Sequence, residues 1–313
     1  MKIPIRLPPR IGRPVDVVGF GENSIDLVAV VPRHPDRNSK VAVRDWQELP
    51  GGQIASAMAA CARLGCRTRY VGRFGNDARG DVGLQSLERE GVDTAFSQRV
   101  PGVASRACVI LVDERNGERT VVFHRDPRLA LPPAALPADA IRDGRVLLVD
   151  ATDLAAATRA ADIARESGIP VIADVDTVVP GIDALLSGVD IVIAAEAFPA
   201  AFIGVGDTGA ALNALAAALP RAAVVCVTLG KEGSLARCDD REVRTPGFTV
   251  ECLDSTGAGD VFRAGFVAAW VRGGDTAELE DVLRYANAAA ALSCRGLGAR
   301  SAPFASDVER ILA

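Results

Sequence analysis

One acidic residue follows a turn of small residues, and this arrangement suits the binding of an anion. Residues 254–260 read Asp-Ser-Thr-Gly-Ala-Gly-Asp and lead into an almost wholly apolar run, which predicts a buried helix. At the start of such a helix, the backbone NH groups of Gly257, Ala258 and Gly259 favour negative charge. Asp260 adds a carboxylate in the first turn that can accept a proton. We therefore expect an anion hole with a general base beside it.

A purely structural interpretation of the same residues is also open. Ser255 or Thr256 is expected to cap the helix, and Asp260 would then only complement the helix dipole. Short glycine-rich turns occur in many proteins that bind nothing there. The residues of this turn alone do not decide between the two interpretations.

A second pair of glycines opens another helix of small residues. Gly51 and Gly52 precede the run 53–64, and Gly65 ends it. This helix start would again present free NH groups to a ligand. Asp26 stands at the head of an apolar strand, close to the end of the first expected strand at 15–20. An acid in a hairpin turn explains Asp26 almost as well as a ligand-binding role.

The elements that must position these residues follow from a regular alternation. Expected strands and helices follow one another from residue 146 onward, with strands at 146–150, 171–174, 189–194 and 223–229 and helices at 154–166, 208–219 and 279–292. This spacing predicts an α/β fold with a doubly wound, mainly parallel sheet and helices on both faces. Ligands bind such sheets at the carboxyl ends of the strands. Asp174 and Asp176 fall at such an end and could lie near a phosphate-bound magnesium ion, although we expect at least one to have a capping role.

Two segments differ from this pattern and predict a small β lid. Residues 105–112 and 119–124 alternate in polarity around an Asn-Gly pair, which is a strong hairpin signal. From such a lid, Arg106, His124 and Arg125 would reach a polar or anionic substituent, although such residues are more often solvated. We expect a lid made of 33–49 and 102–126, inserted in a large domain made of 15–32, 50–101 and 127–313.

Composition limits the partners and the compartment. The 313 residues carry a net charge of -5, with acids and bases mixed along the chain, so neither a nucleic-acid nor a membrane surface is expected. Seven cysteines without paired spacing and no long apolar run favour a reducing cytoplasm. The two histidines, His34 and His124, give little support to a Ser-His-Asp triad. The first fourteen residues, rich in Pro and Arg, are expected to form a loose leader.

These motifs together resemble those of the pfkB or ribokinase-like family of carbohydrate kinases. Residues 254–262 are similar to the C-terminal signature of the family and residues 51–65 to its N-terminal signature, and the resemblance runs from about residue 15 to 304. It implies transfer of the ATP γ-phosphoryl group to a hydroxyl of a monosaccharide, with Asp260 as general base and the backbone of residues 257–259 as anion hole. The implied cofactors are ATP and Mg²⁺, with a monovalent cation such as K⁺ near Asp254 in some relatives.

The resemblance also implies binding roles for named residues. On the sugar side these are Asp26, Gly51, Gly52 and Ser56, with Arg106 added from the lid. On the nucleotide side they are Thr228, Gly230, Gly233 and Asn287. Two departures bear on the substrate: Ser56 stands where the family usually has Asn, and its Asn-x-x-Glu magnesium element is not intact, so that Glu196 is the expected replacement. These departures look more like the sulfofructose kinase and ketohexokinase branch, which favours a ketose.

The same motifs also bear on the partners of the chain and on other functional classes. The implied partners are a sugar, ATP and a second copy of the chain, joined as a homodimer through the lid. A nucleoside kinase of the same fold, or a relative that senses a sugar or nucleotide without catalysis, is the alternative. A Rossmann oxidoreductase is disfavoured because residues 19–24 lack the third glycine of GxGxxG, and the P-loop pattern GxxxxGK[ST] is absent. The intact Gly-Ala-Gly and Asp260 favour the enzyme over the sensor.

Overall fold

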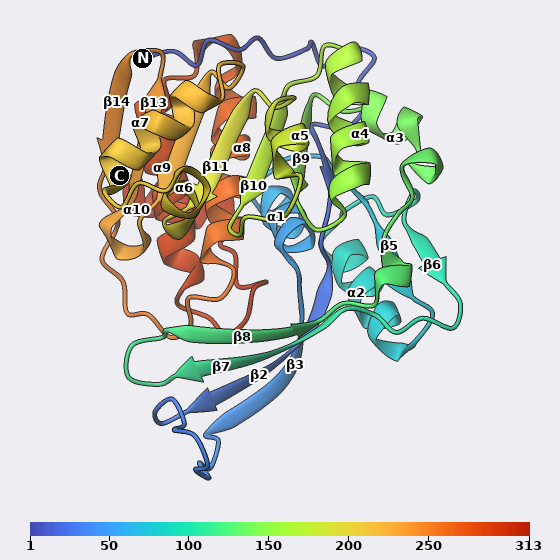
Figure 1. Cartoon of the computed structure of the whole chain (residues 1–313), viewed down its shortest axis with the longest axis vertical. Coiled ribbons are helices and arrows are strands. Elements are labelled where there is room, and N and C mark those ends of the chain that lie inside the picture. Colours follow the sequence, from blue (N-terminus) through green and yellow to red (C-terminus); the bar gives the residue numbers. More distant parts are fainter.

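The computed structural model describes residues 1–313, and an eight-stranded sheet forms its centre (Figure 1). Its order is β14-β13-β12-β11-β10-β9-β1-β4, parallel from β4 to β12, with β13 and β14 antiparallel at one edge. The strands are β1 (Val17–Phe20), β4 (Thr68–Val71), β9 (Val146–Asp150), β10 (Val171–Val175), β11 (Ile191–Ala195), β12 (Val224–Thr228), β13 (Ser234–Cys238) and β14 (Arg241–Thr245). The predicted doubly wound, mainly parallel sheet is confirmed.

Helices cover both faces of this sheet, because successive side chains of each strand point to opposite sides. Val17 and Leu148 pack with the helices of one face, whereas Val18 and Leu147 pack with those of the other. The first face carries α1 (Gln53–Arg63), α8 (Ala258–Gly273) and α9 (Leu279–Ser293), and the second carries α3 (Ala138–Arg142), α4 (Leu154–Glu166), α5 (Ile182–Leu186) and α7 (Thr208–Ala218). The remaining helices are α2 (Ala78–Arg89), α6 (Ala197–Ile203) and α10 (Ala305–Leu312).

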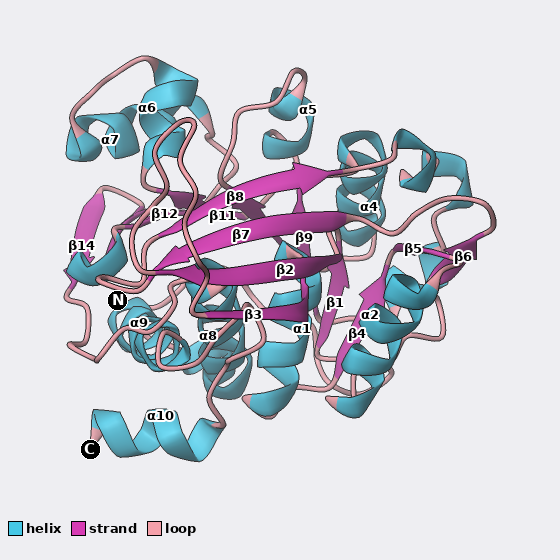
Figure 2. Ribbon diagram, turned by 90° about the horizontal axis from the view of Figure 1, so that it is seen from below, coloured by secondary structure: helices cyan, strands magenta, loops and turns pink.

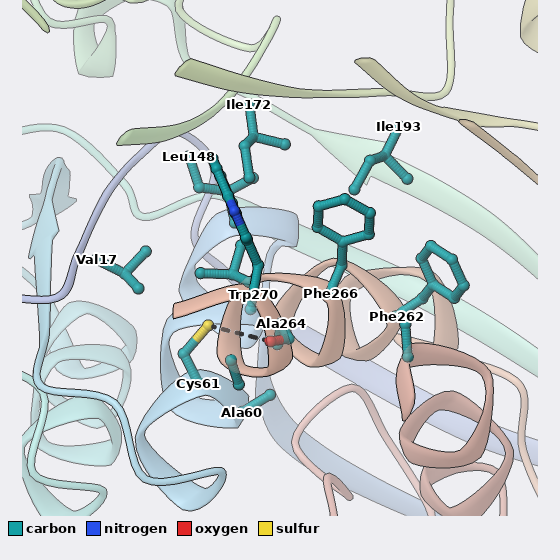
Figure 3. Packing of buried hydrophobic residues seen from close by; sticks show 14 of the residues in the cluster. Val17, Ala60, Cys61, Leu148, Ile172, Ile193, Phe262, Ala264, Phe266 and Trp270 are labelled. Carbon is teal, nitrogen blue, oxygen red and sulfur yellow. Dashed lines mark hydrogen bonds between the residues drawn. The ribbon is translucent and has the colours of Figure 1, made fainter. Parts of the chain in front are cut away.

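Helix α8 is as buried as its sequence predicts, and small residues let it approach its neighbours closely. Figure 3 shows Cys61 of α1 beside Ala264 of α8, with a long hydrogen bond of 3.8 Å from the thiol to the carbonyl oxygen. Phe266 and Trp270 fill the space beneath the strands. A Cβ on Gly265 would lie 2.9 Å from the Cα of Ala286 in α9, so α8 and α9 are in backbone contact. This packing fixes the position of the first turn of α8.

A separate four-stranded sheet lies across one end of the large sheet (Figures 1 and 2). Its order is β3 (Asp45–Gly51), β2 (Ser24–Val31), β7 (Ala107–Asp113) and β8 (Arg119–His124). The hairpin predicted around Asn116 and Gly117 joins β7 to β8, and Gly117 adopts a φ of 69°. A short two-stranded sheet, β5 (Arg73–Gly75) with β6 (Gln98–Val100), lies beside α2.

The boundary between the two parts differs from the expected one. We expected residues 15–32 in the large domain, but β2 pairs with β3 and β7 along its length and belongs to the small sheet. Its apolar run is buried at almost every position, just as in the strands of the large sheet, and therefore does not indicate which sheet it joins. Of the segment expected at 33–49, only residues 45–49 lie in a strand, and this strand continues to Gly51.

The expectation of a loose leader before residue 15 was wrong. Ile3 and Leu7 are buried in the main core, and the backbone NH of Ile3 donates to the carbonyl oxygen of Ala277 at 3.2 Å. These buried side chains, with backbone hydrogen bonds to Ala277 and Leu279, hold this segment against the start of α9. No single helix is long and apolar enough to cross a membrane; only α6 and α7 counted together, as a bent pair, reach that length and composition.

Candidate active site

The sheet reverses its direction of growth beside β1. At such a point ligands bind outside the carboxyl ends of the strands, which here are those of β1 and β9. The chain runs from β1 through α1 to β4 on one side, while β9 to β14 continue on the other. Glu22 and Asp150 meet there, where the NH of Glu22 donates to Oδ2 of Asp150 at 2.7 Å. Burial and the charge of Glu22 raise the pKa of Asp150 to about 7. The small sheet starts directly after this point and lies over the same edge.

The turn before α8 presents free backbone donors. Gly257 is the N-cap residue in a left-handed conformation, with φ 77°, and no side chain caps the helix. The NH groups of Gly257, Gly259 and Asp260 make no hydrogen bond within the chain, whereas that of Ala258 donates to the carbonyl oxygen of Ser255 at 3.3 Å. The structure thus brings the predicted anion-hole residues together, with Ala258 partly engaged in the turn and the NH of Asp260 as an additional free donor.

The expected cap by Ser255 or Thr256 was wrong. The hydroxyl of Ser255 donates instead to the carbonyl oxygen of Gly117 in the small sheet at 2.8 Å, and that of Thr256 is buried without a partner. Since no side chain occupies the helix start, its donors stay available for a ligand. The contact with Gly117 also joins the small sheet to the turn.

Asp254 orders this turn from beneath. It is fully buried, and its two carboxylate oxygens accept hydrogen bonds from the NH groups of Thr256 and Gly298, both at 2.8 Å. A Cβ at Gly257 would lie 2.6 Å from the Cα of Ala299, so the C-terminal segment packs directly on the turn. The left-handed φ and this contact both require glycine at position 257.

Asp260 lies half-buried in the first turn of α8 with a free carboxyl group. No hydrogen bond from the protein reaches this group. Burial, and then the nearby charge of Asp174, raise the pKa of Asp260 well above its ordinary value, while Arg263 and Arg119 act in the opposite direction. A carboxyl group with a raised pKa and no internal partner is suited to accept a proton from a substrate.

The predicted sugar-side residues also come together. Asp26 is buried on β2, and its Oδ1 accepts a hydrogen bond from the hydroxyl of Ser24 at 2.6 Å. Burial raises the pKa of Asp26. Gly51 packs so closely on this carboxylate that a Cβ would meet it, and a Cβ on Gly52 would lie 2.3 Å from the Cα of Asn23. These close approaches explain the glycine pair.

Ser56 and Arg106 have different surroundings. Ser56 is buried on α1, and its hydroxyl has no hydrogen-bond partner. Arg106 forms a buried ion pair with Asp153, at 2.8 Å from Nη2 to Oδ1, and its Nη1 is left without a partner. Arg125, which could have reached a substrate from the lid or been solvated, is paired with Glu22 through two contacts of 2.6 and 2.7 Å. The ion pairs of the two arginines thus connect the small sheet to the loops that follow β1 and β9.

The predicted nucleotide-side residues surround the turn between β12 and β13. Thr228 ends β12, and Gly230 and Gly233 both have positive φ. A Cβ on Gly233 would lie 2.1 Å from the carbonyl oxygen of Thr245. Asn287 of α9 is buried and donates to the same oxygen at 3.2 Å and to the hydroxyl of Ser234 at 3.0 Å. Asn287 therefore joins α9 to β13 and β14 and fixes this turn.

The acidic residues near these strand ends do not form a metal-binding site by themselves. Glu196 is exposed at the start of α6, and no group of three or more His, Cys, Asp or Glu side chains is placed to hold a metal ion. Asp176 accepts a hydrogen bond from the side chain of Gln53 at 3.1 Å. This arrangement fits a magnesium ion carried mainly by nucleotide phosphates, because such an ion needs only one or two protein carboxylates.

One pair of charged residues was not assigned a joint role from the sequence. Nε of Arg263 lies 2.9 Å from Oδ1 of Asp174, and both side chains are buried. Burial raises the pKa of Asp174 to about 6, although Arg263 lowers it. The available signal was the single arginine within the apolar run of α8, since a charged residue there is rarely buried without a partner.

Comparisons with known proteins agree with this geometry. The pattern of the pfkB family carbohydrate kinase matches residues 15–305. The ATP-dependent ribose-1-phosphate kinase of Halopiger xanaduensis is 29% identical over 302 residues, covering 95% of this chain and 98% of the relative. The ribokinase of Bacillus subtilis is also 29% identical, over 94% of this chain and 98% of its own length.

A solved structure extends the similarity to the fold. The ribokinase of Arabidopsis thaliana complexed with ribose and ATP superimposes with a TM-score of 0.80 at 25% identity, covering 95% of this chain and 98% of that chain. The large doubly wound sheet with a small separate sheet is thus the ribokinase-like fold. The chain belongs to the pfkB family of carbohydrate kinases and is a phosphotransferase that acts on an alcohol group.

Proposed function

We propose that the chain is an ATP-dependent sugar kinase that transfers the γ-phosphoryl group of ATP to a hydroxyl of a monosaccharide. The observation that carries this proposal is the combination at the start of α8. Three backbone donors, of Gly257, Gly259 and Asp260, are free beside a carboxyl group that has no partner in the protein. Donors for a phosphoryl group and a proton acceptor are the two groups that this reaction needs.

The proposed step uses these groups in a defined order. The sugar hydroxyl oxygen forms a bond to the γ-phosphorus while the bond from that phosphorus to the bridging oxygen of ADP breaks. The hydroxyl proton passes to the carboxylate of Asp260. The NH groups of Gly257 and Gly259 stabilise the charge on the transferring group. Magnesium on the phosphates would neutralise part of their charge, with Glu196 and Asp176 as candidate carboxylates.

On the acceptor side, Asp26 and the backbone of Gly51 and Gly52 would bind sugar hydroxyls, with Ser56 beneath them. The shorter side chain of Ser56 leaves room for a substituent that an asparagine would exclude, and we retain a ketose as the favoured acceptor. A nucleoside remains the second candidate, because Asp26 would bind ribose hydroxyls equally well. Thr228, Gly230, Gly233 and Asn287 would border the nucleotide.

Two further parts of the proposal concern a cation and the assembly. Both oxygens of Asp254 are engaged by backbone NH groups, so a monovalent cation such as K⁺ would bind this turn through carbonyl oxygens.

We also propose a homodimer through the small sheet, supported by apolar side chains exposed on β8, Val122 and Phe123 among them. All seven cysteines are free, which supports the expected cytoplasmic location.

The test is ADP release with ATP and magnesium across ketoses, aldoses, acidic sugars and nucleosides, with Asp260→Asn beside the wild type. We expect turnover on one acceptor class, lowered on the order of a hundredfold or more in the variant. Asp183→Asn is the matched control, because Asp183 lies exposed in the first turn of α5. Binding of ATP or a sugar without turnover on any acceptor would instead favour the sensing relative.

A further inference from the structure

Arg263 lies one turn into α8 and points back toward its N-terminus. In an α-helix, long side chains lean toward the preceding turn, so residue 263 covers the backbone of residue 259. A Cβ on Gly259 would lie 2.7 Å from Nη1 of Arg263. The guanidinium group therefore touches the same backbone segment whose NH groups form the anion hole.

The contacts of Arg263 use only part of its donor set. Nε faces Oδ1 of Asp174 at 2.9 Å, and Nη2 donates to the carbonyl oxygen of Ile193 at 3.2 Å. Nη1 makes no hydrogen bond within the chain, and protein atoms leave it partly uncovered. The side chain as a whole is only 4% exposed. One donor of a buried and firmly held guanidinium is thus left open beside Gly259.

The ion pair with Asp174 explains how the cation is held. A buried pair of this kind is weak evidence for stability, since removing both charges from water costs as much as their attraction returns. The charge of Asp174 attracts Nε, and the carbonyl oxygen of Ile193 accepts a hydrogen bond from Nη2. The fork geometry of the guanidinium then fixes the direction of Nη1. A lysine has a single charged nitrogen, which could contact either Asp174 or a ligand at Gly259 but not both. The arrangement is therefore specific to arginine.

We propose that Arg263 is a further catalytic residue whose Nη1 binds the terminal phosphoryl group of the nucleotide beside the NH of Gly259, and that Asp174 is its positioning residue. This inference rests on the proposed function. As the γ-phosphorus moves from the ADP oxygen to the sugar oxygen, Nη1 neutralises charge on one of its non-bridging oxygens. The proton still passes to Asp260, so Arg263 neither gains nor loses one.

The test compares wild type with Arg263→Lys in two measurements. One is kcat on the accepted sugar at saturating ATP. The other is the ratio of affinities for ADP and for the non-hydrolysable β,γ-imido analogue of ATP, measured by titration calorimetry, which does not depend on turnover. We expect kcat to fall at least about a hundredfold, as for other arginines that contact a transferring phosphoryl group, and the preference for the analogue over ADP to disappear.

Arg69→Lys is the matched control. Arg69 is also a buried arginine, paired with Asp93 and Asp143 at 2.7 Å each, but it lies near the amino end of β4, away from β10 and β11. Its variant should lose stability without losing kcat or the analogue preference. Asp174→Asn should reproduce the kcat defect of Arg263→Lys in weaker form, because Nη1 remains but the guanidinium is then held only through Nη2 and Ile193.

The outcomes separate this inference from the proposed function. An Arg263→Lys variant that keeps both kcat and the analogue preference overturns the assignment, and so does a wild type that binds ADP and the analogue equally well. A wild type that phosphorylates no acceptor, yet loses its analogue preference in Arg263→Lys, overturns the kinase proposal and supports the phosphate contact.

Discussion

The NH of Gly298 donates to Oδ2 of Asp254 at 2.8 Å, which ties the segment after α9 to the turn that starts α8. The same carboxylate accepts from the NH of Thr256 through its other oxygen. Ala299, the next residue, packs on Gly257. A buried carboxylate with two backbone donors thus sets the geometry of the proposed anion hole.

Asp254→Asn should therefore affect both stability and turnover. An amide has one acceptor oxygen, so either Thr256 or Gly298 would face an NH₂ group and lose its hydrogen bond, at about 1 to 3 kcal/mol of unfolding free energy. We expect kcat to fall as well, because the turn is displaced. Denaturant unfolding and kcat measure the two effects.

Asp190→Asn is the control for that variant. Asp190 also accepts a hydrogen bond from a backbone NH, that of Val171 at 2.9 Å, but at the amino ends of β10 and β11. It should lose stability and keep kcat. Equal losses of kcat in both variants would show that destabilisation alone explains the effect of Asp254.

Gly257→Ala should close the anion hole. The φ of 77° costs a non-glycine residue about 1 to 2 kcal/mol, and the Cβ would also meet the backbone of Ala299 at 2.6 Å. Gly168→Ala carries the same backbone strain, with φ 67°, but nothing lies within 4 Å of its Cβ. Thermal unfolding and kcat of the two variants separate strain from collision. A Gly257→Ala enzyme as active as Gly168→Ala would contradict the proposed site.

Ser56→Ala tests the acceptor side. The hydroxyl of Ser56 is buried without a partner, so its removal should leave the free energy of unfolding unchanged or slightly higher. If the hydroxyl binds the acceptor, KM for the sugar rises while KM for ATP stays the same. An unchanged KM for the sugar would leave Ser56 as a packing residue.

Much of the fold was predictable because its signals are local. An apolar run predicted β9, and the Ala-rich run that ends before Gly168 predicted α4, both with the same bounds as in the structure. The Asn-Gly pair gave the β7–β8 hairpin. The membership of β2 was not predictable, since its side chains are buried on both faces in the small sheet as they would be in the large one.

The site was predictable only in part. Each of the two glycine motifs is a run of consecutive residues and could therefore be found from the sequence. The structure adds the close contacts of Gly51 with Asp26 and of Gly257 with Ala299. The arginine within the apolar run of α8 indicates a buried partner, but no local pattern identifies that partner as Asp174, which is far away in the chain. Likewise, the cap expected from Ser255 fails because a distant carbonyl, that of Gly117, competes for its hydroxyl.

Asp150 should make stability depend on pH. Its folded pKa of about 7 exceeds its unfolded value of 3.8, so the folded state binds the proton more tightly. Its contribution is therefore most favourable below about pH 4 and is lost as pH rises through 7. Relative to Asp150→Asn, the wild type should lose on the order of 2 to 4 kcal/mol between pH 5 and pH 8. If the free energy of unfolding changed with pH by the same amount in both proteins across this range, the assignment would be contradicted.

The pH dependence of turnover tests Asp260 directly. The carboxyl group must be deprotonated to accept the sugar proton, and its pKa is raised by burial and by Asp174. Activity should therefore be lost as pH falls through a value above the ordinary range of an aspartate, and it should be full above that value. The measurement is kcat/KM against pH for wild type and Asp260→Asn. The residual turnover of the variant should lack this acidic limb; if the limb persists there, another group, such as Asp174 or Asp150, controls it and Asp260 is not the base.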